Sequence, residues 1–462
     1  MAQNIGNDSE ATPLLIKIKH EEVYLRFKPA QKRVILAIVS ITGLLPLFVS
    51  GTFVPSIPQI AKDLNSNGIV VSWAVSLSIL ASSLGSLLGA TYSAFYGRKP
   101  VYLVGTPLLF IGSMGVASAQ TIPQLMVWRI IQALGASPGL AVGSGVIGDI
   151  YKLEERGQAM GIFFAAVLLG PALAPLAGGV AAHYFSWRIM QMWLGLCGLL
   201  VFFVALFIFP ETYHPGERGV DKADPTSLPT WRPILINPLK PLWIMRSPNL
   251  LAVTTAGMFT LLTDYVLLVP IAYTIGAKYN ITNEALIGAC FLPCVGAPLA
   301  GTISDKVVIY YRKSRGGVWY PEDRLRATLI GALIFIPLSV LGSGLLTEYV
   351  PGRVGLVLNL ICLFFNGLGV DFVLSPSAAY VVDLMHSRSA EASAAGNGFR
   401  SIAMALAVAG ILPMIDTYGV VVTNTVAAIL AWIGFILLWG TIRYGDRLRA
   451  VVDVGFSTAD NN

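Results

Sequence analysis

Four charged side chains interrupt long apolar stretches of this sequence, and their types limit the chemistry they can do. They are Arg129 in WRIIQALGAS, Asp264 in LLTDYVLL, Asp371 in GLGVDFVL and Arg400 in NGFRSIAM. An arginine at the centre of an apolar helix costs about 2.5 kcal/mol or more even on a lenient insertion scale. Arg129, with Gln132 about one turn later on the same face, is therefore expected to face a wet cavity or a carboxylate. A buried structural ion pair is the alternative.

Proton exchange requires a group that titrates, and an arginine keeps its proton in proteins. A carboxylate would therefore carry any exchanged proton, and Asp264 and Asp371 are the best placed to do so. Burial favours the neutral carboxyl, whereas Arg129 or Arg400 close by would favour the ionised form. Substrate binding that shifts this balance would release the proton. A purely structural role stays open for both aspartates, and Asp264 lies near the outer end of its apolar stretch.

The elements that must position these residues are apolar helices, because 55% of the 462 residues are hydrophobic, 12% are charged and the mean hydropathy is +0.70. Runs of about 20 apolar residues, the length that crosses a bilayer as a helix, recur along nearly the whole chain. The sequence predicts an all-α integral membrane protein with twelve such helices in two sets of six, over 34–56, 70–92, 101–119, 123–149, 157–183, 188–209, 251–276, 284–305, 327–346, 354–383, 391–415 and 421–442. The predicted domains are a tail at 1–33, a six-helix bundle at 34–209, a linker at 210–250, a second six-helix bundle at 251–442 and a tail at 443–462.

The distribution of Lys and Arg predicts that both tails and the linker lie in the cytoplasm, where such residues collect. With this orientation the opposite side carries only Lys62, Arg188, Lys278 and Arg353. The net charge of +6 then implies contact with anionic lipid headgroups rather than with nucleic acid. The polar first 33 residues do not resemble a cleavable signal, so the first helix is expected to stay in the bilayer.

Motifs for enzymatic or ATP-driven chemistry are missing from the sequence. The cysteines Cys197, Cys290, Cys294 and Cys362 fall in predicted helices, where they serve as small packing residues. The four histidines are scattered without metal-ligand spacing. Neither a phosphate-binding G-x-x-x-x-G-K-[ST] loop nor an H-E-x-x-H motif occurs. We therefore expect no metal, no cofactor and no enzymatic activity, and any uphill transport would draw on an ion gradient.

Short internal repeats indicate that the second half of the chain duplicates the first. ATYSA (90–94) corresponds to GTISD (301–305), and GDIY (148–151) corresponds to VDLM (382–385). Each pair is short, but the pairs occur in the same order with similar offsets. Such repeats are common in transporter folds, so they favour a six-plus-six arrangement.

Four motifs give the chain a resemblance to the major facilitator superfamily, and specifically to its fungal twelve-helix drug:proton antiporters. YGRKP (96–100), WRIIQALGAS (128–137), GPALAPLAGG (170–179) and FPET (209–212) each resemble a family signature. The resemblance covers nearly the whole chain and implies two six-helix bundles around a central cavity. It implies a role for Arg129 in proton coupling or substrate-anion binding. It also implies a monomer in the plasma membrane, or in a vacuolar or other internal membrane.

The GPALAPLAGG motif is expected to bend its helix and to tighten its packing. Pro171 and Pro175 each remove a backbone donor, and Gly170, Gly178 and Gly179 let a neighbouring helix approach closely. The resemblance makes that neighbour the predicted helix over 284–305, which carries GAPLAG. Their contact would form a pivot and seal between the bundles. The alternative is a kinked, tightly packed helix without a special function.

The signature that follows the second predicted helix departs from the family pattern. Ala94 stands where family members usually have an aspartate that helps to lock the cytoplasmic gate. We expect Asp149, with Arg98 or Lys99, to replace it in the first bundle, and Asp305 and Asp383 to act in the second. The expected gate residues are therefore Gly97, Arg98, Lys99, Asp149, Asp305 and Asp383.

The expected function is a proton-coupled antiporter that exports a small organic molecule by alternating access. Two intramembrane arginines favour an organic acid, such as an itaconate-like dicarboxylate, or a secondary metabolite. The aspartates equally suit a polyamine or a drug. A proton-coupled nutrient importer and a non-transporting membrane sensor are the remaining alternatives.

Two connecting segments complete the predictions. The sequon Asn280-Ile281-Thr282 would face outside as a glycosylation acceptor close to the membrane. The loop over 310–326, YYRKSRGGVWYPEDRLR, carries no recognisable chemistry. We expect it to be solvated and to contact lipid headgroups.

Overall fold

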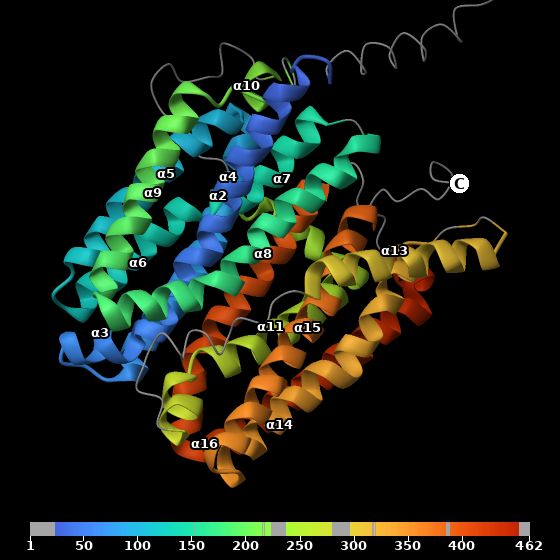
Figure 1. The fold of residues 1–462 in the computed structure, drawn as a ribbon. Coiled ribbons are helices and arrows are strands. Elements are labelled where there is room, and N and C mark those ends of the chain that lie inside the picture. Colours follow the sequence, from blue (N-terminus) through green and yellow to red (C-terminus); the bar gives the residue numbers. More distant parts are fainter. Residues whose placement is uncertain are drawn as a thin grey trace, which may run out of the picture.

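Long helices that run roughly alongside one another form two groups, one from each half of the chain (Figure 1). The computed structural model describes residues 24–151, 153–214, 216, 218–222, 237–279, 296–316, 318, 320–384 and 389–451. Within these ranges the chain contains helices and no strand. The sequon at Asn280 lies outside the described residues, so its glycosylation stays a prediction.

The first half supplies the blue to green helices of Figure 1. They are α2 (Pro29–Phe53), α3 (Ile57–Asp63), α4 (Gly68–Tyr96), α5 (Arg98–Ser118), α6 (Ile122–Ala136), α7 (Pro138–Ile150), α8 (Leu153–Tyr184), α9 (Trp187–Phe207) and the short α10 (Gly219–Lys222). The second half supplies the yellow to red helices α11 (Pro248–Leu268), α13 (Gly296–Ser314), α14 (Ile336–Tyr349), α15 (Gly352–Leu384) and α16 (Ser389–Val451). The domain boundaries near 210–250 stay a prediction.

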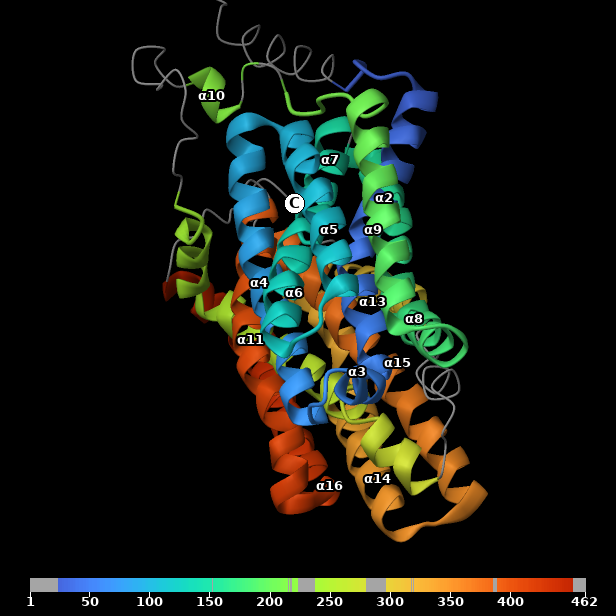
Figure 2. The same cartoon turned by 90° about the vertical axis from the view of Figure 1, so that its left-hand side faces the viewer.

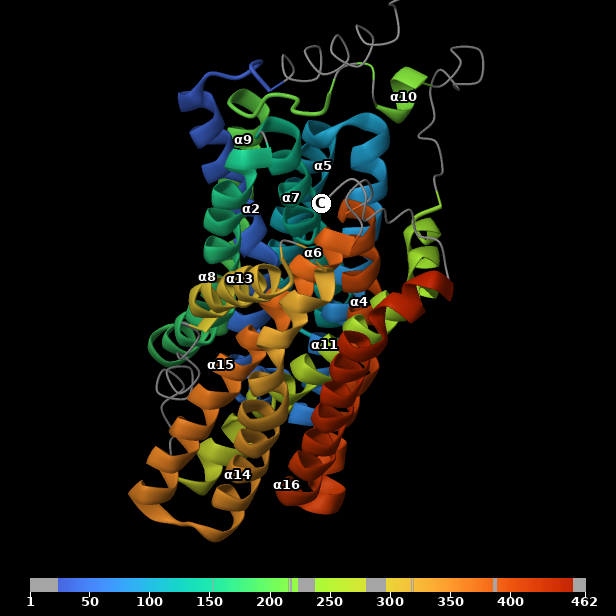
Figure 3. The ribbon, with the colours of Figure 1, turned by 90° about the vertical axis from the view of Figure 1, so that its right-hand side faces the viewer.

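Ten helical segments of the described chain are long and apolar enough to cross a membrane. The last of them, Ala392–Arg449, contains two of the predicted spans, because Gly419 has φ 84° and divides α16 into two helices. The predicted span 284–305 begins outside the described residues. Its described part belongs to α13, which runs across the other helices in Figures 1 and 3.

The local sequence explains how several helices begin. Asn67 accepts a hydrogen bond from the Val70 N–H at 2.9 Å and caps α4, as short polar side chains do at helix N-termini. Gly97 has φ 106°, a backbone conformation that glycine adopts without strain, and it turns α4 into α5. Pro138 begins α7 directly after α6, at a position that tolerates the missing backbone donor.

One buried apolar cluster of the described residues joins the two halves. It combines Phe53 and Val71 of the first half with Val266 and Met404 of the second. Other buried clusters each draw on a single half. Figure 2 shows the two groups of helices overlapping around α3, α4 and α11, and α4 contacts α16 across the halves.

Candidate functional site: two buried polar clusters

Arg129 lies two turns into α6 with 0% of its surface exposed. Its Nη1 donates to the Gln132 side-chain oxygen at 2.8 Å and to the Val49 carbonyl at 3.4 Å. The guanidinium carbon stands 4.2 Å from the centre of the Phe53 ring, a cation–π distance. Nε and Nη2 of Arg129 are buried without a hydrogen-bond partner among the described residues. No described carboxylate pairs with this arginine, so the structural ion pair considered from the sequence is not present in this part of the chain.

Gln132 is held by residues that the sequence motifs did not reveal. Its Nε2 donates to the Ser113 hydroxyl of α5 and to the Gln191 side-chain oxygen of α9, both at 2.8 Å. All of these side chains are buried. Gln191 is a polar residue in the otherwise apolar stretch IMQMWLGLCG (189–198), and this exception was the available sequence signal. The three side chains connect α5, α6 and α9 through satisfied hydrogen bonds.

The second cluster belongs to the second half. Asp264 of α11 and Asp371 of α15 are close enough to interact electrostatically, as two like charges. Arg400 of α16 donates to the Asn397 side-chain oxygen at 2.8 Å and lies near Tyr265, the residue after Asp264. The structure therefore brings together two of the five predicted cavity residues, Asp264 and Asp371, and places Arg400 near Tyr265. No described hydrogen bond or ion pair joins them to Arg129 and Gln132, whose cluster remains in the first half.

Contacts between the halves near these clusters are hydrogen-bonded as well as apolar. The Ser83 hydroxyl of α4 donates to the Gly398 carbonyl of α16 at 2.9 Å. Both residues are tightly packed, because a Cβ built at Gly398 would lie 3.0 Å from Leu87. The α4–α16 contact therefore holds the halves together beside Arg400.

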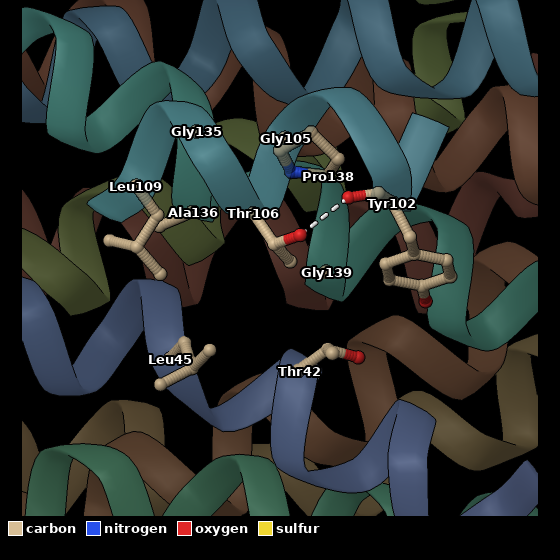
Figure 4. Close-up of a pocket in the computed structure, with 10 residues that line it drawn as sticks. All are labelled: Thr42, Leu45, Tyr102, Gly105, Thr106, Leu109, Gly135, Ala136, Pro138 and Gly139. Atoms are coloured by element: carbon tan, nitrogen blue, oxygen red, sulfur yellow. Dashed lines mark hydrogen bonds between the residues drawn. The ribbon is translucent and has the colours of Figure 1, made fainter. Parts of the chain in front are cut away.

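The described chain also contains a small void inside the first half, shown in Figure 4. It is lined by Thr42, Leu45, Tyr102, Gly105, Thr106, Leu109, Gly135, Ala136, Pro138 and Gly139. Its two threonine hydroxyls are bonded within their own helices, since Thr106 donates to the Tyr102 carbonyl at 2.8 Å and Thr42 to the Val39 carbonyl at 2.9 Å. The Tyr102 hydroxyl is buried without a hydrogen-bond partner among the described residues. We interpret it as a packing void between α2, α5, α6 and α7, separate from both clusters.

The GPALAPLAGG motif packs on α2 of its own half. Its helix α8 also contacts α13, the described part of the expected partner. A Cβ built at Gly170 would meet Leu47 at 3.0 Å. Ala174 packs against Gly51, and Gly178 against the backbone of Thr52. Residues 170, 174 and 178 share one face because they are four apart. On α13, Ala300 is fully buried, and no described atom lies within 4 Å of a Cβ built at Gly301. A seal between GPALAPLAGG and GAPLAG therefore stays a prediction.

The prolines of this motif do not end the helix. Pro171 and Pro175 lie inside α8, which continues from Leu153 to Tyr184 and curves along its length in Figure 1. Gly179 is buried. Proline is tolerated within membrane helices where neighbouring groups compensate for the lost hydrogen bond. The expected bend is therefore present, whereas a pivot role stays a proposal.

At the cytoplasmic end of the first half, Arg98 is the centre of a charge cluster. Its Nε lies 2.9 Å from the Asp149 carboxylate, and its Nη1 donates to the Ser93 hydroxyl at 2.8 Å. Glu211 accepts the backbone N–H groups of Arg98 and Lys99 at 2.9 and 3.1 Å. It thereby caps the positive N-terminus of α5. The Lys99 amine instead donates to the Leu206 carbonyl, so Arg98 is the partner of Asp149.

A related cluster lies in the second half. Arg324 bridges Asp305 at 2.9 Å and Asp383 at 2.7 Å, and the sequence motifs had not identified this arginine. Both clusters are internal to one half, and no described ion pair connects them. Their role as gate residues therefore stays a prediction.

The loop expected to be solvated is instead partly buried. Glu322 and Asp323 are 6% and 1% exposed. The Glu322 carboxylate lies 2.5 Å from Arg449, and Asp323 receives two hydrogen bonds from Arg315 at 2.5 and 2.7 Å. These pairs tie the loop to the end of α16 and to the end of α13. The charged residues of PEDRLR are typical of a surface segment, and the sequence alone does not show which distant side chains pair with them.

Long apolar helices with buried charged residues are typical of a membrane transport protein. Residues 39–408 match the family model "Major Facilitator Superfamily". The chain belongs to this superfamily, and its fold is the major facilitator fold.

Curated relatives include fungal efflux proteins. The chain is 26% identical to "Efflux pump radE" of Floropilus chiversii, over 91% of this chain and 82% of that protein. It is 28% identical to "MFS-type transporter atr4" of Stereocaulon alpinum, over 90% and 78%. It is 34% identical to "MFS antiporter QDR3" of Candida albicans (strain SC5314 / ATCC MYA-2876), over only 39% of this chain and 26% of that protein. These likenesses support a resemblance to fungal efflux transporters.

Solved structures confirm the fold. The xylose transporter XylE from E. coli, described as partially occluded and inward open, superposes with a TM-score of 0.63 at 15% identity, over 89% of this chain and 97% of that chain. A bacterial homolog of the human lysosomal transporter Spinster, described as inward-facing, superposes with a TM-score of 0.62 at 14% identity, over 90% and 99%. At these identities the likeness concerns the fold alone.

Proposed function

We propose that the protein is a proton-coupled antiporter that exports a small organic molecule, either an organic acid or a secondary metabolite, by alternating access. One observation carries the proposal: each half holds a buried polar cluster within its spanning helices, one cationic around Arg129 and one with the carboxylates Asp264 and Asp371. Intramembrane ionisable residues mark substrate or proton pathways. A relative named as an efflux pump and another named as an antiporter support export as the direction of transport.

The carboxylate cluster supplies the proton step. Two carboxyl groups that interact in a buried site resist being ionised together, so one of them retains a proton. Asp264 and Asp371 interact in this way. When substrate enters the space between the halves from the cytoplasm, its charge alters this balance and releases the proton. Reprotonation from outside then resets the carrier, and the transmembrane proton gradient drives export without a cofactor.

The arrangement of the halves supports entry from the cytoplasm. In this proposal the apolar cluster that joins the halves closes the external side, and the ion-pair clusters around Arg98 and Arg324 remain within their own halves. Rocking of the halves would bring the cytoplasmic clusters together and open the outer cluster. We place this carrier, as a monomer, in the plasma membrane, where an inward proton gradient is available.

A second candidate is export of a polyamine or another organic cation. The observation that favours it is the same carboxylate pair, because an ammonium group placed between Asp264 and Asp371 would displace the retained proton directly. In that case Arg129 would orient helices and would not touch the substrate.

The test compares the growth medium of fungal cells that lack the protein, overproduce it, or overproduce Asp371→Asn, by untargeted mass spectrometry at two external pH values. We expect a compound that accumulates outside only with the intact protein, and more strongly at the lower external pH. Asp371→Asn at equal membrane abundance should abolish the pH dependence. A compound that instead disappears faster from the medium would overturn export, and a pH-independent rate would overturn proton coupling.

A further inference from the structure

The Arg98–Asp149 ion pair is covered by a short segment that follows α9. We call this segment, residues 209–214, the strap; the connection to the second half begins with it. Glu211 in the strap accepts the backbone N–H of Arg98 at 2.9 Å, and the Tyr213 ring lies 4.8 Å from the Arg98 guanidinium carbon. The strap is therefore bound to α5, the helix that supplies the arginine of the pair.

The strap is also bound to α7, the helix that supplies the aspartate. Nε2 of the His214 ring lies 3.0 Å from the Asp149 carbonyl oxygen. A carbonyl oxygen only accepts hydrogen bonds, so Nε2 must carry a hydrogen and donate it. Because the strap holds both Arg98 and Asp149, a conformational change that moves either residue toward the second half must first break contacts of the strap.

The segment that precedes α2 also contacts the strap. Arg26 donates to the Tyr213 carbonyl at 3.2 Å, and the Tyr24 ring packs edge-on against the His214 ring, with the ring centres 5.9 Å apart. Phe27 packs against the buried apolar cluster of the first half. His214 is thus half-buried and contacts both the N-terminal segment and the end of α7.

His214 stands among charged groups, and histidine is the side chain whose charge ordinarily changes between about pH 5 and 8. The titratable and charged side chains on the elements around it are Arg98, Asp149, Glu211, Tyr213, Tyr24 and Arg26. Among them, the Asp149 carboxylate interacts electrostatically with His214. A positive imidazolium is attracted to this carboxylate. Protonation therefore strengthens the binding of the strap, and loss of the proton as the pH rises weakens it.

We propose that the strap is a cytoplasmic pH sensor, in which protonation of His214 holds the Arg98–Asp149 pair within the first half and slows the transport cycle when the cytoplasm is acidic. This inference rests on the proposed function, because an antiporter that exports its substrate in this way brings protons into the cell. Slower transport at low cytoplasmic pH limits that acid load. His214 is a regulatory residue in this scheme and does not carry the transported proton.

Hydrogen–deuterium exchange of the purified full-length protein, measured by mass spectrometry, tests the strap without a substrate. The backbone N–H groups of Arg98 and Lys99 donate to Glu211 of the strap, so their exchange reports release of the strap. After correction for the intrinsic effect of pH on exchange, we expect these amides to exchange about two- to fivefold more slowly at about pH 6 than at about pH 8. This is the range that an ion pair between partly exposed groups allows.

Two variants separate a sensor from a structural residue. His214→Gln keeps an N–H donor for the Asp149 carbonyl but cannot gain a charge, so it should remove the pH dependence of exchange. His183→Gln changes an exposed histidine near the end of α8 and should behave as the intact protein does. The same pH dependence in the intact protein and in His214→Gln, or exchange in the intact protein that does not depend on pH, would overturn the sensor. A merely structural role for His214 would change exchange equally at both pH values.

Export from cells distinguishes failure of the sensor from failure of the proposed function. The cytosol is acidified at constant external pH, and transporter-dependent compounds in the medium are quantified by untargeted mass spectrometry. Acidification also lowers the proton gradient, so the intact protein and His214→Gln are compared under the same conditions. We expect His214→Gln to export about two- to fivefold faster than the intact protein in acidified cells and equally fast at neutral cytosolic pH. Equal export in acidified cells would overturn the slowing of transport. If no compound depends on the protein, export and its regulation are both overturned, whereas the exchange measurement still decides whether the strap responds to pH.

Discussion

Replacing Gly178 by alanine tests the packing of α8 on α2 at a single backbone contact. A Cβ at Gly178 would lie 2.7 Å from the Thr52 carbonyl carbon and closer still to its oxygen, whereas ordinary contact begins at 3.4 Å. The two helices would have to separate locally by about 0.7 Å or more. No side chain can rotate to relieve this contact, because the obstructing atoms belong to the backbone. Overpacking of this kind costs about 1–3 kcal/mol.

Two glycines provide matched controls. Gly161, on the same helix, and Gly301, on α13, have nothing within 4 Å of an added Cβ. Alanine there should stabilise the helix by about 0.5–1 kcal/mol, because glycine has the greater backbone freedom when unfolded. The free energies of unfolding of Gly178→Ala and Gly161→Ala should therefore differ by roughly 1.5–4 kcal/mol.

Thermal unfolding of the detergent-solubilised protein, followed by size-exclusion chromatography with fluorescence detection, measures the difference. We expect the midpoint of Gly178→Ala to fall roughly 5 °C below that of Gly161→Ala. Equal midpoints for these two variants would refute the α2–α8 contact. If Gly301→Ala were the destabilised protein instead, the helix over 284–305 would be the close-packed surface after all.

Two other substitutions probe the cytoplasmic clusters. Ala94→Asp places a carboxylate at an exposed position next to Ser93, which already accepts from Arg98; we expect a folded protein whose transport rate in vesicles is slower or rebiased in direction. Unchanged kinetics would remove the assignment of Arg98 and Asp149 to the gate. Asp323→Ala removes a carboxylate whose side chain is 2% exposed and leaves Arg315 unpaired. It should lower the free energy of unfolding by about 3 kcal/mol, the low end for such pairs, because the Arg315 side chain is 30% exposed. A denaturation midpoint equal to that of the intact protein would show that the buried pair contributes nothing.

The helices could be predicted from the sequence because bilayer thickness imposes a length and a composition on each of them. The division of α16 at Gly419 and the family motifs were predictable for the same local reasons. The packing and ion-pair partners that lie far apart in the sequence could not be predicted in this way. Small residues in the motif around Gly170 show only that some helix approaches closely; they do not reveal the packing on α2, which carries the complementary Gly51. Glu322 and Asp323 resembled a surface loop because nothing local reveals that Arg449 and Arg315 will cover them.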